Sequence, residues 1–361
     1  MKRRRYLLPL VAVVSLAACA PRPVVRDAGA GAWTLYVGLI KTQGYVVGSP
    51  LASSGLHRLD HDPPQGAEAD LNWTHVGWNT PRISGIAVRS DDPSTMFLAS
   101  GNGVLRTTDG GVTWRLTTGW EVTEVQDVAV DALRPDEVYL ASAYGVWVSK
   151  DNGDTWQEYN DGLRRKYTQS IETDSNTPSR VLAATETGIF ESTGGAGGWH
   201  RVGPAGLNAM DIQQSTLEPD VWLVGAQGGG LWLSRDDGAT WRKQEGSGDR
   251  SFYGVAINPL DPLQMAATGW DTAVHLTTDG GVTWRRIAGQ LPTPNNYEVV
   301  FDRNVSGRLW IATVERGVYF TDDFGQTWGN GTLPGTLVFD MLFVPNTARN
   351  TAASSAGGGS K

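Results

Sequence analysis

The chain has 361 residues, of which 40% are hydrophobic and 19% are charged, and it contains 45 glycines, 18 prolines and 15 tryptophans. This composition excludes a disordered chain, which would lack so much large apolar surface, and it excludes collagen, which needs a strict Gly-X-Y order. The formal charge is −8, and outside the first five residues the only basic cluster is Arg164-Arg165-Lys166, so we expect no nucleic-acid partner.

The first 18 residues have the pattern of an export signal. Residues 1–5 (MKRRR) are basic, and residues 6–18 form an apolar stretch that is too short for a stable transmembrane helix. Residues 16–19 (LAAC) resemble the lipobox of bacterial lipoproteins, in which the cysteine becomes the lipid-modified N-terminus after cleavage. The resemblance implies a signal peptide at 1–18, lipidation of Cys19 and an exported protein that is anchored to the membrane through this lipid. The alternative is an ordinary signal peptide followed by a chance cysteine.

Residues 19–32 are expected to be a flexible tether between the lipid and the folded part. Ala20 follows the cysteine where an aspartate would mark inner-membrane retention in Gram-negative lipoproteins, so the resemblance implies the outer membrane, the periplasm or the cell surface. Cleavage would leave 26 basic residues against 38 acidic ones, a charge of −12. Since Cys19 is the only cysteine, no disulfide can form within the chain and the fold must depend on a packed core.

An octapeptide with the pattern (S/T)-x-D-x-G-x-T-W recurs along the chain. Complete copies occupy residues 107–114, 149–156, 234–241, 277–284 and 321–328, and a degenerate copy occupies residues 192–199. The tryptophans that end these units, with Trp73 before them, are separated by 41, 42, 43, 42, 43 and 44 residues. Such regular spacing indicates a repeat architecture with one structural unit per octapeptide.

The octapeptide resembles the Asp-box, or bacterial neuraminidase repeat, and the resemblance covers nearly the whole chain after the tether. An aspartate in a tight turn can accept backbone N–H bonds, the glycine two positions later supplies a positive φ angle, and the tryptophan has the bulk to pack between neighbouring sheets. We therefore assign structural roles to the aspartates and tryptophans of the complete copies. They are Asp109, Asp151, Asp236, Asp279, Asp323, Trp114, Trp156, Trp241, Trp284 and Trp328.

Four short strands are predicted in each repeat. An apolar triplet such as residues 86–88 marks the first strand, and a run such as residues 96–100 (MFLAS) marks the second. A segment that opens with Gly and an apolar residue, such as residues 103–107, marks the third, and the fourth begins at the tryptophan. Four strands in a repeat of this length are typical of a propeller blade.

The strand patterns at the two ends of the chain together make up one blade. Residues 34–39 and 55–60 match a second and a third strand with no first strand before them, whereas residues 338–344 match a first strand with nothing after it. We predict an all-β fold, a single seven-bladed β-propeller of four-stranded blades at residues 33–346, closed by pairing of the N- and C-terminal strands. Residues 347–361 are expected to be a disordered tail.

The predicted binding face is the one opposite the octapeptide turns. The residue before the apolar triplet is a carboxylate in four repeats, and aromatic residues precede several of these positions. An acidic mouth lined with aromatic rings could bind a glycan, a cation or a basic peptide. The alternative is that the carboxylates are solvated or bond neighbouring backbone. The candidate ligand-binding residues are Asp127, Asp211, Glu298, Asp340, Tyr253, Tyr297, Arg82, Trp120, Trp270 and Asp271.

Asp-box propellers include sialidases, xyloglucanase-type glycosidases, sortilin-like receptors and a photosystem II assembly factor, so the fold alone assigns no activity. Residues 82–84 (RIS) depart from the Arg-Ile-Pro motif of sialidases, and Tyr297 and Glu298, adjacent on a strand, are expected to point to opposite faces. Xyloglucanase-type enzymes need two opposed carboxylates, which the acidic ring could supply, but they usually have two propellers with a cleft between them. The assembly factor is marked by an arginine-rich patch, which this acidic chain does not show.

We therefore predict a binding or assembly scaffold in the cell envelope, whose partner is an envelope protein or a polysaccharide, with a glycoside hydrolase that uses the mouth carboxylates as the alternative. No catalytic residue is assigned. No cofactor and no metal is predicted, since His57 and His61 would lie about 13 Å apart on a strand. The protein is expected to be a monomer, and the insertion at residues 44–54 is a place to seek specificity.

Overall fold

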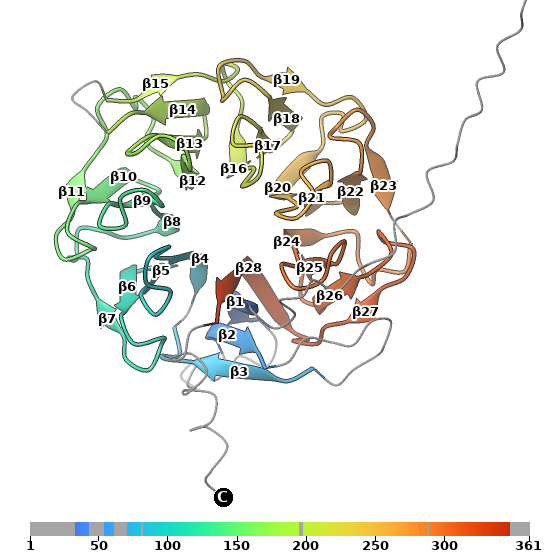
Figure 1. Cartoon of the computed structure of the whole chain (residues 1–361), viewed down its shortest axis with the longest axis horizontal. Coiled ribbons are helices and arrows are strands. Elements are labelled where there is room, and N and C mark those ends of the chain that lie inside the picture. Colours follow the sequence, from blue (N-terminus) through green and yellow to red (C-terminus); the bar gives the residue numbers. More distant parts are fainter. Residues whose placement is uncertain are drawn as a thin grey trace, which may run out of the picture.

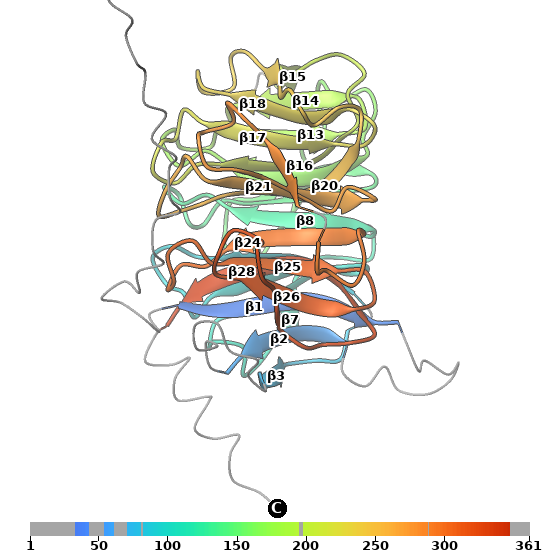
Figure 2. The same ribbon diagram turned by 90° about the vertical axis from the view of Figure 1, so that its right-hand side faces the viewer.

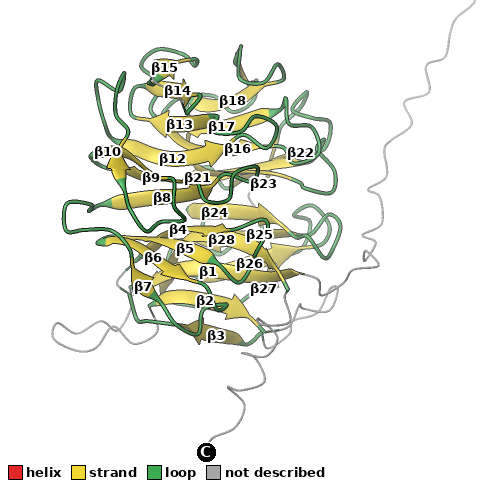
Figure 3. Cartoon of the chain, turned by 60° about the vertical axis from the view of Figure 1, so that its left-hand side comes forward, coloured by secondary structure: helices red, strands yellow, loops and turns green. Residues whose placement is uncertain are grey.

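The computed structural model describes residues 33–42, 54–60, 71–80, 82–194, 198–287 and 289–346. Every helix or strand assigned in these ranges is a β-strand (Figure 3). Nothing in this part of the chain is a helix long and apolar enough to cross a membrane. The predicted signal peptide, Cys19, the tether, most of the insertion at 44–54 and the tail at 347–361 lie outside the described residues.

Seven four-stranded antiparallel sheets form a ring, with the first strand of each sheet toward the central axis and the last at the rim (Figure 1). The blades, each from its inner to its outer strand, are blade 1, β4 (Ile83–Val88), β5 (Met96–Ser100), β6 (Gly103–Thr107) and β7 (Arg115–Leu116); blade 2, β8 (Val125–Val130), β9 (Val138–Ser142), β10 (Gly145–Ser149) and β11 (Gln157–Glu158); blade 3, β12 (Thr168–Thr173), β13 (Val181–Thr185), β14 (Gly188–Ser192) and β15 (His200–Arg201); blade 4, β16 (Ala209–Gln214), β17 (Trp222–Ala226), β18 (Gly230–Ser234) and β19 (Arg242–Lys243); blade 5, β20 (Ser251–Ile257), β21 (Met265–Trp270), β22 (Val274–Thr277) and β23 (Arg285–Ile287); blade 6, β24 (Asn296–Phe301), β25 (Leu309–Thr313), β26 (Gly317–Thr321) and β27 (Gly329–Asn330); and blade 7, β28 (Thr336–Pro345), β1 (Trp33–Lys41), β2 (Gly55–Leu59) and β3 (Trp73–Val76). The predicted seven-bladed β-propeller is confirmed.

Blade 7 is built from both ends of the described chain. Its inner strand β28 pairs antiparallel with β1, from Trp33 opposite Pro345 to Lys41 opposite Thr336. The two strands, the blue β1 and the red β28, lie side by side in both Figure 1 and Figure 2. The predicted closure by terminal strands is therefore confirmed, and it removes the exposed sheet edges that an open ring would carry.

The hydrophobic core is divided into seven clusters, one between each pair of neighbouring blades. The second strands, such as β5 and β9, are buried along their whole length because adjacent blades cover both of their faces. The outermost strands have only two to four residues, and in several, such as β7 and β11, every residue is exposed. Short outer strands limit the backbone edge that each blade presents to solvent.

Each octapeptide forms the turn from the third to the fourth strand of its blade. In residues 149–156, Asp151 accepts hydrogen bonds from Thr155 N (2.8 Å), Thr155 Oγ1 (2.6 Å) and Ser149 Oγ (2.8 Å). Gly153 has a φ of 81°, and a Cβ there would lie 2.8 Å from Phe97 of blade 1, so only glycine fits this approach between blades. The same bonds to the aspartate recur at Asp109, Asp236, Asp279 and Asp323.

The tryptophan of each octapeptide packs against the preceding blade. Trp156 Nε1 donates to Thr117 Oγ1 of blade 1 (3.4 Å), and Trp284 Nε1 donates to Gln244 Oε1 of blade 4 (3.3 Å). Trp114 and Trp241 instead donate to the glycine carbonyl of their own turn, both at 3.0 Å. All five assigned tryptophans, including Trp328, belong to or pack against the interblade clusters.

Candidate functional site at the channel mouth

A β-bulge interrupts the pairing of every inner strand with its neighbour. The extra residues of these bulges are Ser84, Gln126, Gln169, Met210, Tyr253, Tyr297 and Phe339, and the residues that follow them are Gly85, Asp127, Ser170, Asp211, Gly254, Glu298 and Asp340. All of these except the two glycines line, together with Arg82, one cavity of about 80 Å³. We call it the channel mouth. It lies toward the beginning of the inner strands, the end of the ring remote from the octapeptide turns.

The bulges correct one expectation from the sequence. Tyr297 and Glu298 were expected to point to opposite faces of a regular strand, but both line the channel mouth. The expectation is wrong because the pairing of β24 with β25 shifts between Asn296 and Glu298. The extra residue breaks the alternation of side chains, so two consecutive side chains turn toward the axis.

Three of the four mouth carboxylates are hydrogen bonded to the backbone of their own blade and of the next. Asp127 accepts bonds from Val128 N at Oδ1 (2.7 Å) and from Ile171 N of blade 3 at Oδ2 (3.0 Å). Bonds to the next blade also reach Asp211, from Val255 N (2.8 Å), and Asp340, from Ile86 N (2.6 Å). Three of the four candidate carboxylates thus tie adjacent inner strands together.

Glu298 differs from the other three. Its Oε1 accepts a bond from its own Val299 N (2.8 Å), and its Oε2 accepts no hydrogen bond from the described residues. The carboxylates alternate with Gly or Ser from blade 1 to blade 6, but blade 7 follows with a second carboxylate, Asp340. The N–H of the next blade that would match the bond of the other carboxylates is that of Met341, and it already bonds Asp340. Glu298 is therefore the carboxylate with an oxygen left for a ligand.

A belt of aromatic rings follows the bulge residues of blades 5 to 7. The ring centroids of Tyr253 and Tyr297 are 5.9 Å apart, and those of Tyr297 and Phe339 are 5.3 Å apart in an edge-to-face contact. Arg82 extends the belt into blade 1, with its Cζ 4.7 Å from the centroid of Phe339 and its Nη2 donating to Gln126 Oε1 at 2.8 Å. The guanidinium shows that a cation is accommodated against these rings.

Desolvation inside the mouth raises the pKa of its carboxyl groups. Burial is the main cause of a pKa of about 7 at Asp127, about 6 at Asp211 and about 8 at Asp340, and repulsion between the carboxylates adds to it at Asp127 and Asp340. Burial, followed by repulsion from Asp211 and Asp340, also raises the pKa of Glu298 well above its ordinary value. At neutral pH the mouth therefore retains protons that free carboxylic acids would have lost.

The sequence reasoning missed Glu172. This half-buried side chain lies on β12, and burial, with repulsion from Asp127 and Asp211, raises its pKa to about 8. Glu172 stands two positions after Ser170, and residues two apart on a strand share a face. That spacing was the signal that could have placed it beside the mouth.

The remaining candidates lie on loops at the same end of the ring and are not part of the cavity lining. Trp120, on the loop from blade 1 to blade 2, is 92% exposed, and Trp270, at the end of β21, is 56% exposed. Asp271 follows it with a φ of 55° and donates its N–H to Asn295 Oδ1 (2.8 Å). Two further exposed aromatic residues of this end are Trp78 and Tyr144. Within the described ranges no group of three or more His, Cys, Asp or Glu side chains could hold a metal ion.

Comparison with protein families and curated proteins gives partial matches. The family described as Sortilin, neurotensin receptor 3 (Sortilin-Vps10) matches residues 229–337. A probable oligoxyloglucan-reducing end-specific xyloglucanase of Neosartorya fischeri is 28% identical over 122 residues, which cover 33% of this chain and 15% of the relative. Xyloglucanase Xgh74A of Acetivibrio thermocellus is 26% identical over 155 residues, which cover 36% and 18% respectively. The chain thus spans less than a fifth of the length of these relatives.

Solved structures resemble the ring as a whole. The GH74 enzyme of Niastella koreensis matches 85% of this chain and 55% of its own, with a TM-score of 0.60 and 14% identity. YCF48 from Cyanidioschyzon merolae matches 71% of this chain and 87% of its own, with a TM-score of 0.56 and 15% identity. The chain has the fold of these β-propellers. At such identities the likeness extends to the fold alone, since unrelated functions share it.

Proposed function

We propose that this chain is an exported, lipid-anchored binding scaffold of the cell envelope, which holds a glycan or a protein on its channel-mouth face without cleaving it. The anchor rests on the lipobox-like residues that end at Cys19. The observation that carries the binding role is the exposure of aromatic side chains on the loops around the mouth, above all Trp120 at 92%. Large exposed aromatic side chains mark interaction sites, and their flat faces suit the apolar faces of sugar rings.

The mouth itself supports binding rather than hydrolysis. Its volume of about 80 Å³ is far below the roughly 300–1,000 Å³ of a typical small-molecule pocket, so the cavity cannot enclose a sugar ring with its neighbours. The carboxylates of Asp127, Asp211 and Asp340 already accept backbone N–H bonds from the next blade. A carboxylate that holds two strands together is not free to approach a glycosidic bond.

The test is a glycan array with the purified protein, followed by calorimetry with the best ligand and chromatography of the incubated mixture. Trp120→Ala is expected to weaken binding at least tenfold. Leu133→Ala, at an exposed side chain of the opposite end of the ring, is the matched control and is expected to leave affinity unchanged. Binding that Trp120→Ala does not weaken, or cleavage of the bound glycan, contradicts the proposal.

A glycoside hydrolase remains the second candidate because of Glu298. This residue has a raised pKa, as a general acid needs, and a carboxylate oxygen without a partner in the described part of the chain. The partial matches to xyloglucanases point to xyloglucan oligosaccharides as the substrates to assay. On this alternative, product release from such oligosaccharides would be lost in Glu298→Gln and kept in Leu133→Ala, whose side chain lies at the opposite end of the ring. A parent protein that releases no product excludes it for these substrates.

A further inference from the structure

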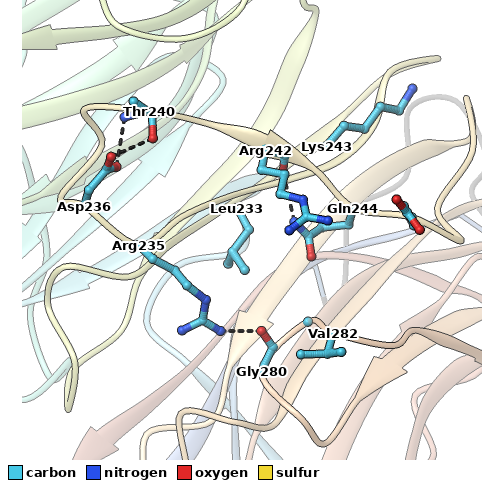
Figure 4. A pocket seen from close by; sticks show the side chains of 11 residues that line it. Leu233, Arg235, Asp236, Thr240, Arg242, Lys243, Gln244, Gly280 and Val282 are labelled. Atoms are coloured by element: carbon cyan, nitrogen blue, oxygen red, sulfur yellow. Dashed lines mark hydrogen bonds between the residues drawn. The ribbon is translucent and has the colours of Figure 1, made fainter.

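A groove of about 340 Å³ lies between blades 4 and 5, at the octapeptide-turn end of the ring and away from the channel mouth (Figure 4). Its floor includes the buried Leu233, with Arg235 and Arg242 on either side of it and Val282 beyond (Figure 4). Arg235 and Arg242 come from blade 4, whereas Val282 belongs to the octapeptide of blade 5. The groove therefore combines an apolar floor with two guanidinium groups, in a chain whose formal charge is −8.

The interface between blades 1 and 2 fills the same place in the repeat differently. Between blades 1 and 2, Arg115 follows the tryptophan of its octapeptide as Arg242 does, and it faces Asp154, the sixth residue of the next octapeptide. Asp154 forms ion pairs with Arg115 (3.8 Å) and with Arg106 (2.8 Å). The equivalent of Asp154 in blade 5 is Val282, which is 78% exposed. The groove thus carries an apolar side chain at the place where Asp154 pairs with Arg115 between blades 1 and 2.

The consequence is an arginine without an internal partner. Arg235, the second residue of its octapeptide, donates to the Gly280 carbonyl, and the equivalent carbonyl of Asn152 accepts from Arg106, which precedes its own octapeptide. The guanidinium of Arg242 forms no ion pair or hydrogen bond with the described residues. The acidic residues of the groove do not neutralise it: Asp236 is engaged by Thr240 and Ser234, and Glu245 is exposed.

The backbone beside Arg242 is open as well. Arg242 lies on β19, the last strand in the order of its sheet, and no described strand pairs with its outer edge. An exposed strand edge offers N–H and C=O groups to an extended peptide, while pockets alongside select its side chains. A free guanidinium next to an open edge suits a peptide carboxylate, because the planar fork of arginine matches a carboxylate through two bonds.

We propose that this groove binds an extended acidic peptide segment of a partner protein. An Asp or Glu side chain of the segment pairs with Arg242, a neighbouring apolar side chain rests on Leu233 and Val282, and the backbone of the segment runs along β19. This surface is separate from the channel mouth, because it lies at the opposite end of the ring. The protein can therefore hold two partners at the same time.

The test is fluorescence anisotropy of the full chain with a labelled peptide of alternating Glu and Val, and with a Gln and Val counterpart. The Glu peptide is expected to bind, and Arg242→Gln is expected to weaken it at least tenfold. Val282→Asp is expected to weaken it similarly, since it gives Arg242 an internal carboxylate like the one that Asp154 presents to Arg115. Arg115→Gln is the matched control and is expected to leave affinity unchanged. Melting curves establish that each variant is folded.

Three results would overturn the inference. The first is that Arg242→Gln and Val282→Asp bind the Glu peptide as tightly as the parent protein does. The second is that the Gln peptide binds the parent protein as tightly as the Glu peptide does, which would show that the carboxylate is not recognised. The third is that sodium hexanoate displaces the labelled peptide at the same concentration as the unlabelled peptide, which would show that the groove recognises a small carboxylate and not an extended segment. Each outcome is decided in the same assay with folded protein.

Discussion

Removal of the closing strand is expected to unfold the whole propeller, because blade 7 depends on pairing between the two ends of the described chain. A chain that ends at residue 335 lacks β28 and with it the buried side chains of Val338, Met341, Phe343 and Val344. At about 1.5–3 kcal/mol for each buried side chain, these four contribute about 6–12 kcal/mol. The usual stability of a domain is about 5–15 kcal/mol, so the loss is comparable to the whole.

The assay is complementation. The truncated chain is expected to lack a cooperative melting transition and to aggregate through the unpaired edge of β1. A synthetic peptide of residues 336–346, added during refolding, is expected to restore the transition, because it supplies both the strand pairing and the Asp340 carboxylate that accepts the Ile86 N–H bond. The control chain ends at residue 346 and retains every described contact of β28. A chain ending at 335 that melts like this control, or rescue by a scrambled peptide, would refute the reasoning.

Three other outcomes follow. The folded pKa values of Asp127 and Asp340, about 7 and about 8, exceed the ordinary aspartate value of about 3.9, so the stability that these groups contribute is full below about pH 4 and is lost as pH rises to about 8. Urea titrations are therefore expected to give a lower unfolding free energy at pH 8 than at pH 5. Glu298→Gln is expected to reduce that difference. An unchanged difference would contradict repulsion within the mouth. Trp156→Ala is expected to lower the unfolding free energy by about 2–4 kcal/mol, slightly less than removal of a fully buried tryptophan would, because the indole is half-buried. Loss of ligand binding without a change in stability would contradict its structural role. Cys19→Ser is expected to move the protein from the membrane to the soluble fraction with an unchanged melting temperature, and membrane retention of a correctly cleaved variant would count against the lipid anchor.

The channel mouth shows where sequence reasoning succeeds and where it stops. Alignment of the repeats brought Asp127, Asp211, Glu298 and Asp340 to one position, and the structure places all four in one cavity. The same alignment could not reveal that three of them bond the next blade, because those partners are backbone N–H groups, which every sequence contains. It also placed Tyr297 and Glu298 on opposite faces, since a bulge has no fixed residue signature here. The bulge residue differs in every repeat except for two glutamines and two tyrosines.

The groove between blades 4 and 5 is a second feature that the sequence could not predict. Arg242 and Val282 are 40 positions apart, and each is ordinary at its place in the repeat. Only the ring geometry brings both to one groove, and the pair of Arg115 and Asp154 shows the ion pair that this place in the repeat can hold. A residue that is ordinary within its own blade thus helps to line a groove against the neighbouring one.

The sequence by itself determined the repeat, the number of blades, the strands within them and the closure of the ring by its two ends. These follow from local rules: alternation of side chains fixes the strands, turn residues fix the octapeptides, and unmatched strands at the termini must find each other. The tertiary structure alone decided which mouth carboxylates bond the next blade, and that within the described ranges one oxygen of Glu298 and the guanidinium of Arg242 have no partner. Those properties belong to contacts between blades. They depend on where one repeat meets the next in space, which no pattern within a single repeat encodes.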